Sequence, residues 1–136
     1  MKNILKDYLR QRPLFLSLIM AKEAWLFQRY LPLKRPTLDV GCGDGFFAGV
    51  TFNKIDIGLD LTESRIKEAE DKDVYEKLLI YNGHEIPLKS TSVSNAVSNC
   101  VLETVPNLEE LLKEIARTLK PGGGFITTVM AAPSAM

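Results

Sequence analysis

The 136-residue sequence contains few of the residues that build disulfide frameworks and metal clusters. It has two cysteines, Cys42 and Cys100, and a single histidine, His84. Two cysteines do not make a disulfide framework, and this usage fits a reducing compartment, so we expect a cytoplasmic protein. A metal site built from these three side chains would need a further ligand, and the ligands would have to be better spaced along the sequence. We therefore expect no metal centre.

Long hydrophobic runs are also lacking. The apolar run at residues 14–21 is too short to span a bilayer. It follows several basic residues, as in a signal peptide, but Pro13 and Lys22 flank it and no small-x-small cleavage pattern follows. We therefore expect the run to form a helix of the mature protein.

The sequence has no formal net charge, yet its charges are unevenly distributed. Residues 1–36 hold eight Lys or Arg against two acids, whereas residues 37–136 hold nine basic and fifteen acidic residues. The basic segment is expected to contact something acidic, either a partner or the protein's own acidic body. Basic residues are few elsewhere and form no RNA- or DNA-binding motif, so no nucleic-acid partner is expected.

Two regions are predicted: an N-terminal helical arm, residues 1–36, and a core domain, residues 37–136. Apolar residues near helical spacing indicate the arm's helix, namely Phe15, Leu18, Ile19, Leu26 and Tyr30. Pro32 and Pro36 end the arm. The arm is interpreted either as a helix that packs on the sheet and completes its core, or as a lid or membrane-surface helix over an acceptor site.

Strands and helices alternate in the core domain. Strands are predicted at residues 37–40, 54–59, 78–81, 93–98 and 125–129, and helices at residues 46–50, 63–71 and 108–119. Thr62 and Asn107 are predicted to cap the last two helices. This alternation predicts an α/β fold with a doubly wound, mainly parallel sheet.

In such sheets, ligands bind at the carboxyl ends of the strands. The first strand ends in Leu38-Asp39-Val40-Gly41-Cys42-Gly43-Asp44-Gly45, where alternate glycines let a ligand approach the backbone. A fixed carboxylate, Asp39, beside backbone amides suits a zwitterionic or cationic ligand. Asp60 ends the second strand and can accept both ribose hydroxyls, although it could also be a solvated acid that precedes a helix.

Four ordered motifs resemble the Rossmann-like (class I) S-adenosylmethionine-dependent methyltransferase family. They are the glycine loop at residues 38–45, Gly58-Leu59-Asp60-Leu61, the segment at residues 82–88, and Ser98-Asn99-Cys100-Val101-Leu102-Glu103. Residues 111–128 resemble the helix and strand that follow the fourth motif. The family fold has two further strands, so the resemblance implies a core truncated after the fifth strand, whose exposed edge could pair in a dimer.

The resemblance implies S-adenosylmethionine as cofactor and S-adenosylhomocysteine as product. The glycine loop would lie under the methionine group, with Asp39 near its ammonium; Asp60 would bind the ribose. Leu61, Gly83 and His84 would border the adenine, and the Asn99 backbone would line the methyl-donor end. The implied cofactor-binding residues are Asp39, Gly41, Cys42, Gly43, Gly45, Asp60, Leu61, Asn82, Gly83, His84 and Asn99.

The expected function is methyl transfer to a small-molecule or lipid-linked acceptor by in-line displacement. The donor is already activated, so alignment and exclusion of water supply much of the acceleration. No catalytic residue is assigned, because Thr104 occupies the position where the family often has a histidine. The alternatives are a non-catalytic S-adenosylmethionine-binding module and an NAD(P)-dependent oxidoreductase, which the Gly-x-Gly-x-Gly spacing disfavours.

Overall fold

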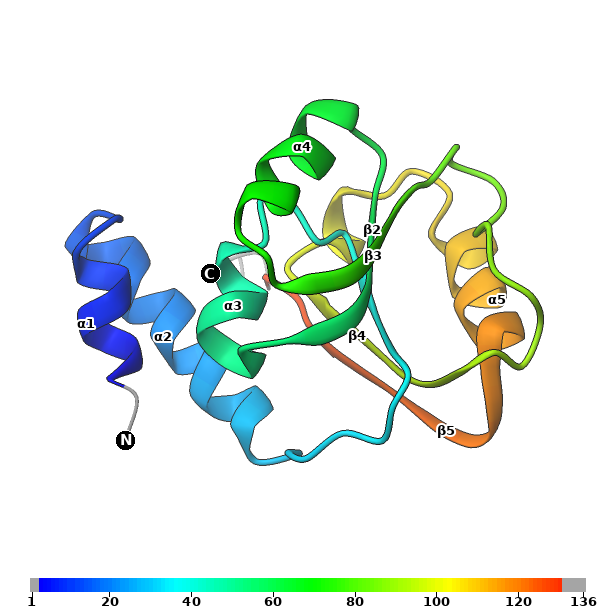
Figure 1. The fold of residues 1–136 in the computed structure, drawn as a ribbon, viewed down its shortest axis with the longest axis horizontal. Helices are drawn as coiled ribbons and strands as arrows, with labels where there is room; N and C mark the ends of the chain where they lie inside the picture. The colour runs from blue at the N-terminus through cyan, green and yellow to red at the C-terminus, as the bar shows by residue number, and fades with distance from the viewer. Residues whose placement is uncertain (1–2, 131–136) are drawn as a thin grey trace, which may run out of the picture.

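A computed structural model describes residues 3–130, which form a five-stranded sheet with helices on both faces (Figure 1). The strands are β1 (Thr37–Val40), β2 (Ile55–Asp60), β3 (Tyr75–Ile80), β4 (Val93–Asn99) and β5 (Leu119–Thr128). The helices are α1 (Ile4–Leu9), α2 (Leu14–Gln28), α3 (Phe46–Phe52), α4 (Glu63–Asp71) and α5 (Leu108–Thr118), with a 3₁₀ turn at Leu102–Thr104. No helix within residues 3–130 is long and apolar enough to cross a membrane.

The strand order β3-β2-β1-β4-β5 places β1 at the centre of the sheet. All neighbouring strands pair in parallel, so their carboxyl ends meet at one edge. The predicted α/β class and parallel sheet are therefore confirmed. Strand order reverses between β1 and β4, and this is the point where ligands bind in such sheets.

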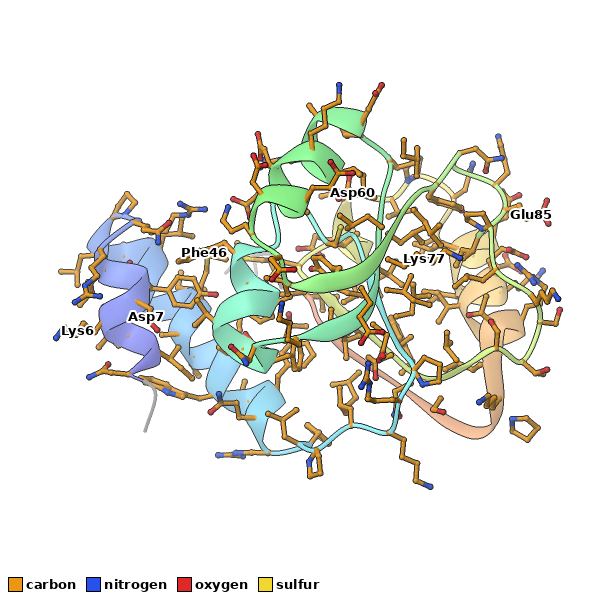
Figure 2. All side chains as sticks on the ribbon, in the orientation of Figure 1. Lys6, Asp7, Phe46, Asp60, Lys77 and Glu85 are labelled. Atoms are coloured by element: carbon orange, nitrogen blue, oxygen red, sulfur yellow. The ribbon has the colours of Figure 1, made fainter. Side chains whose placement is uncertain are left out.

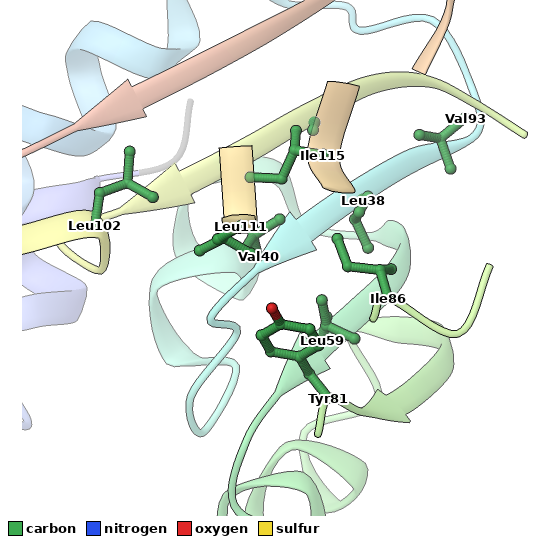
Figure 3. Packing of buried hydrophobic residues seen from close by; sticks show 10 residues of the cluster. Leu38, Val40, Leu59, Tyr81, Ile86, Val93, Leu102, Leu111 and Ile115 are labelled. Atoms are coloured by element: carbon green, nitrogen blue, oxygen red, sulfur yellow. The ribbon is translucent and has the colours of Figure 1, made fainter. Parts of the chain in front are cut away.

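One core lies between the sheet and α5 (Figure 3). Leu38 and Val40 of β1 pack there with Leu111 and Ile115 of α5, and all four are at most 3% exposed. Successive strand residues point to opposite faces, so Asp39 points to the other face of the sheet. This alternation sends the carboxylate toward the glycine loop and the N-terminal arm.

The arm packs on that other face, through α2 and α3 (Figure 1). Phe27 of α2 is 2% exposed and lies in a cluster with Ala48 of α3 and Val97 of β4. A second cluster joins Tyr8 of α1 to Phe46 of α3, with ring centroids 5.0 Å apart. The structure thus shows the packed helix of the first interpretation; a membrane contact of the arm stays a prediction.

The predicted helix of the arm is present as α2, and the apolar residues that indicated it are not the ones it buries. Its buried residues are Ser17, Ala21, Ala24 and Phe27. Phe15, by contrast, is 76% exposed. The helix is apolar almost all round, so its periodicity does not single out one face. Small side chains face inward because they let α2 approach its neighbours closely.

Two basic residues of the arm, Arg12 and Arg35, contact the protein's own acidic body. Arg35 donates from Nε to Oδ1 of Asp56 at 2.7 Å and also pairs with Glu76. Asp56 accepts a second hydrogen bond from the Thr37 backbone N–H at 2.7 Å, at the start of β1. Arg12 pairs with Asp44 of the glycine loop at 3.3 Å. Part of the positive charge of the arm is therefore balanced by acidic residues of the same chain.

Several boundaries differ from the prediction. The edge strands β3 and β5 begin earlier, at Tyr75 and Leu119, because polar or glycine-rich segments pair with β2 and β4 there. The predicted side-chain caps were also wrong: Thr62 and Asn107 occupy N-cap positions, but neither side chain accepts a capping hydrogen bond. Instead, the Thr62 backbone N–H donates to Oδ1 of Asp60 at 3.1 Å.

Candidate functional site

The glycine loop turns sharply at the end of β1. The backbone N–H groups of Gly41 and Cys42 both donate to the Leu59 carbonyl, at 2.7 and 2.9 Å, which ties the loop to the end of β2. Gly41, Gly43 and Gly45 have φ values of 76°, 55° and 79°. L-residues with a Cβ rarely adopt these left-handed angles, which explains the alternate glycines.

Asp60 is fixed by the same loop. Its Oδ2 accepts from the Gly43 backbone N–H at 2.9 Å, and its Oδ1 accepts from the Thr62 N–H at 3.1 Å. Figure 2 shows Asp60 at the end of β2, next to the start of α4. Each carboxylate oxygen can accept more than one hydrogen bond, so both retain capacity for ribose hydroxyls.

Asp39 is a buried carboxylate, 6% exposed, at the centre of the site. Burial, with a smaller contribution from the nearby Asp60 carboxylate, raises the pKa of Asp39 to about 6. The Tyr75 hydroxyl opposes this rise, because it donates to Asp39 Oδ2 at 2.5 Å and stabilises the charged form. At neutral pH Asp39 therefore carries a negative charge that can pair with a cationic group.

A cavity of about 370 Å³ opens at the carboxyl edge of the sheet. We call it the sheet-edge cavity. Five predicted site residues line it: Gly41, Asp60, Leu61, Gly83 and His84. Residues 100–107 contribute much of the remaining wall, with apolar side chains from the sheet and α5. The sheet-edge cavity is mainly apolar and contains one carboxylate. It therefore suits a ligand with a planar, weakly polar group in the apolar part, attached to a ring whose hydroxyl groups the carboxylate can bind.

A second cavity, of about 290 Å³, lies between the glycine loop and the arm. We call it the arm-side cavity. Five predicted residues line it: Asp39, Gly41, Cys42, Gly43 and Asn99. Arg12, Leu16, Met20, Asp44, Phe46, Phe47 and Arg65 complete its lining. Gly41 lines both cavities, so an elongated ligand can extend from one to the other across the loop.

Two predicted site residues line neither cavity. Gly45 is the N-cap of α3 and takes part in the turn of the loop. Asn82 shapes the turn after β3, because its Oδ1 accepts from the backbone N–H groups of His84 and Glu85, both at 2.9 Å. Contacts of these two residues with a cofactor stay predictions.

Both cysteines are held in their thiol form. Burial, with the neighbouring Asp39 and Asp60 carboxylates, raises the pKa of Cys42 well above its usual range. Cys100 donates from Sγ to Oε1 of Glu23 at 3.1 Å, and burial raises its pKa to about 11. Cys42 is therefore a small filler in the loop, and Cys100, directly after β4, links the end of that strand to α2.

Two residues of the site were not found from the sequence. Tyr75 lies 36 positions from Asp39, and no motif links them. Arg12 lies 32 positions from Asp44; its one signal was the basic excess of the arm, which pointed to an acidic contact without specifying it. Both are long-range contacts that depend on how β3 and the arm pack.

The sheet order, the glycine loop and the carboxylates at the ends of β1 and β2 define a Rossmann-like, nucleoside-binding protein. Residues 38–127 match the family model described as a methyltransferase domain. The chain therefore belongs to the Rossmann-like family of S-adenosylmethionine-dependent methyltransferases, and this membership implies S-adenosylmethionine as the cofactor.

Three similar proteins illustrate this membership. Uncharacterized protein MJ1123 of Methanocaldococcus jannaschii is 33% identical over 114 residues, which are 84% of this chain and 53% of that protein. An Arabidopsis thaliana tRNA (carboxymethyluridine(34)-5-O)-methyltransferase is 31% identical over 78% of this chain and 26% of its own length. A putative methyltransferase solved in complex with the Haloferax volcanii Trm112 methyltransferase activator is 25% identical. Its TM-score is 0.67, over 81% of this chain and 51% of that one. The chain thus spans about half, or less, of these proteins.

Proposed function

We propose that the sheet-edge cavity binds the adenosyl group of S-adenosylmethionine and that the arm-side cavity binds its methionine group. The observation that carries this proposal is the position of Asp60, which lines the sheet-edge cavity while two backbone N–H groups fix its carboxylate. A fixed carboxylate at the end of β2 is the feature that recognises ribose in this architecture.

The residues present fit this cofactor. A Cβ built on Gly43 or on Gly83 would meet no atom within 4 Å, so both glycines border open space. Gly43 lines the arm-side cavity and Gly83 lines the sheet-edge cavity. A side chain at either position would occupy space that a ligand needs. The buried Asp39 carboxylate supplies a partner for an ammonium group.

S-adenosylmethionine, when bound, supplies an electrophilic methyl group on a sulfonium, which an acceptor takes by in-line displacement. The role of the chain is to position and to exclude water. Asp60 and the glycine loop fix the nucleoside end, and Asp39 holds the amino-acid end. Asn99 lies at the end of β4, where its side-chain Oδ1 accepts from the Thr128 hydroxyl at 2.5 Å and is held in place.

The proposed acceptor is a small or lipid-linked molecule. Its support is the apolar part of the arm-side cavity, to which α2 contributes Leu16 and Met20 and α3 contributes Phe46 and Phe47. These side chains lie beside the charged groups that we assign to the methionine end, so an acceptor with an apolar portion can lie next to the methyl donor. A nucleic-acid acceptor has less support, because basic residues are few outside residues 1–36 and the sequence holds no RNA- or DNA-binding motif.

Calorimetry tests the cofactor. We expect S-adenosylmethionine and S-adenosylhomocysteine to bind and NAD not to bind. Asp60→Asn keeps the size of the side chain but removes its charge, and charge-assisted hydrogen bonds contribute about 1.5–3 kcal/mol each. Affinity for S-adenosylhomocysteine should therefore fall by at least about tenfold. Binding of NAD alone would overturn the proposal, and an unchanged affinity in Asp60→Asn would refute the ribose assignment.

Glu63→Gln provides the matched control. Glu63 lies three residues after Asp60, in the first turn of α4, and its carboxylate pairs with Lys67 at 3.4 Å on the same helix. It lines neither cavity. Glu63→Gln removes one carboxylate charge, as Asp60→Asn does, but it should leave cofactor affinity unchanged. A loss of affinity in Asp60→Asn alone would therefore reflect a specific contact of Asp60 and not a general effect of charge.

A further inference from the structure

The N-terminal arm brings a cation into the wall of the arm-side cavity. Arg12 lies between α1 and α2 and lines this cavity together with Asp39, Gly41 and Gly43. The motifs that indicate the family begin at residue 38, so no family motif includes this residue. The cavity therefore holds a buried carboxylate from β1 and a guanidinium from the arm.

Arg12 is held in place by three contacts. Its Nη2 donates to Oδ2 of Asp44 at 3.3 Å, and its Nη1 donates to the Gln11 carbonyl at 3.2 Å. Its Cζ lies 4.8 Å from the centroid of the Phe46 ring, which lies between the arm and α3 (Figure 2). A guanidinium has five N–H donors, so donors remain for a ligand.

Tyr8 of α1 packs against the aromatic partner of Arg12. Its ring packs against Phe46, and its hydroxyl is one of two buried side-chain polar atoms in residues 3–130 that have no hydrogen-bond partner. Burial raises the pKa of Tyr8, Glu23 and Asp44 raise it further, and Arg12 lowers it, so the hydroxyl lies in the field of these charges. A buried donor without a partner is costly, but Tyr8 is fully buried and lines neither cavity, so Arg12 is the polar group of the arm that a ligand can reach.

We propose that Arg12 binds the carboxylate of the cofactor's amino-acid group, so that the arm completes the cofactor site. This inference rests on the proposed function. The planar fork of a guanidinium matches a carboxylate. Asp39 supplies the opposite charge for the ammonium, and the two side chains together fit a zwitterion. The arm is thereby a positioning element of the site as well as a packing layer.

Arg65 of α4 is the rival residue, because it lines the same cavity. Its side chain is 54% exposed and pairs with Glu68 of its own helix at 3.2 Å. The Arg12 side chain is 31% exposed. The less solvated guanidinium, fixed on the glycine loop by Asp44, is the stronger candidate, since an exposed charge is weakened by solvent and salt.

Calorimetry on the full chain with two ligands tests the assignment. One ligand is S-adenosylmethionine; the other is decarboxylated S-adenosylmethionine, which keeps the sulfonium and the ammonium but has no carboxylate. Arg12→Ala should weaken binding of the first by about 10- to 100-fold, as expected for a charge-assisted pair, and leave the second within about twofold. Arg10→Ala, an exposed arginine of the same arm, should change neither.

The second ligand also controls for misfolding, because a chain that has lost its arm or its fold would bind both ligands more weakly. Arg12→Lys keeps the charge without the fork and should give an intermediate loss for S-adenosylmethionine alone. Equal losses for the two ligands in both variants would overturn the assignment, as would a selective loss in Arg65→Ala instead. If neither ligand bound the unaltered chain, the proposed function itself would fail, and this inference with it.

Discussion

The contact of Gly41 with Val101 gives a quantitative test of how the glycine loop is built. Gly41 has a φ of 76°, and a Cβ built on it would lie 2.4 Å from Cγ2 and 2.8 Å from Cγ1 of Val101. Val is stiff about χ1, so its methyl groups cannot move away cheaply. Gly41→Ala therefore combines a left-handed alanine with a clash.

The two effects have separate magnitudes. A left-handed L-residue costs about 1–2 kcal/mol, and overpacking costs about 1–3 kcal/mol. Gly41→Ala should therefore lower the free energy of unfolding by about 2–5 kcal/mol. Gly43→Ala is the matched control, because its φ is 55° and its Cβ would meet nothing within 4 Å. Only the backbone cost of about 1–2 kcal/mol applies there.

Urea unfolding of the single and double variants measures both numbers. In a double-mutant cycle, Val101→Ala should recover part of the loss in Gly41→Ala, but not all of it, since Val101 Cβ would still lie 3.1 Å from the new Cβ. Gly43→Ala should lose only about 1–2 kcal/mol of stability yet bind the cofactor poorly, because its methyl group enters the arm-side cavity. Equal destabilisation in the two alanine variants, with no coupling to Val101, would refute the reasoning.

Two further predictions concern the arm and the buried carboxylate. Phe27→Ala should cost about 3–5 kcal/mol in urea unfolding, whereas Phe15→Ala, at a side chain 76% exposed, should cost less than about 0.5 kcal/mol; similar values would contradict the observed packing of α2. Because the pKa of Asp39 is about 6, cofactor affinity measured by calorimetry should fall as pH drops through 6, and Asp39→Asn should abolish that dependence. Tyr75→Phe removes the hydrogen bond that lowers the pKa of Asp39, so the midpoint should move to higher pH; an unmoved midpoint would exclude this coupling.

The effect of Asp39 on stability has the opposite sign to its effect on binding. Its pKa in the folded chain is above the ordinary value, so between about pH 4 and pH 6 the folded state binds more protons than the unfolded state. The contribution of Asp39 to the free energy of unfolding therefore decreases as pH rises through this range. Binding improves over the same range, because the ligand needs the charged form.

Much of the fold could be predicted because the central strands are short, apolar and flanked by turn residues. β1, buried at all four positions, is the clearest example. The edge strands were harder, since β3 exposes Glu76 and Lys77 in its first half and lacks an apolar run there. The face of α2 could not be read from its spacing, because apolar residues surround the helix and only packing against α1 and α3 selects one face.

The candidate site could be predicted only where its residues lie within a local motif. The glycine loop and Asp60 follow directly from two strand ends, and the structure places both at cavity walls. Tyr75 and Arg12 reach the site from β3 and from the arm, through contacts that span 36 and 32 positions. Sequence patterns of single elements carry no information on such contacts.

The N-terminus of α3 explains why this glycine loop favours a cationic donor over a dinucleotide. A pyrophosphate would bind to free backbone N–H groups at the start of that helix. Here the Phe46 N–H already donates to Oδ1 of Asp44 at 3.0 Å, and α3 has only seven residues. Arg12 and Lys72 both pair with Asp44, but Asp39 and Asp60 add two carboxylates that no Lys or Arg within residues 3–130 pairs with, so a pyrophosphate there would meet two uncompensated negative charges. The same carboxylates attract a ligand that carries a sulfonium and an ammonium group. This loop therefore favours the positively charged methyl donor over the negatively charged pyrophosphate of NAD.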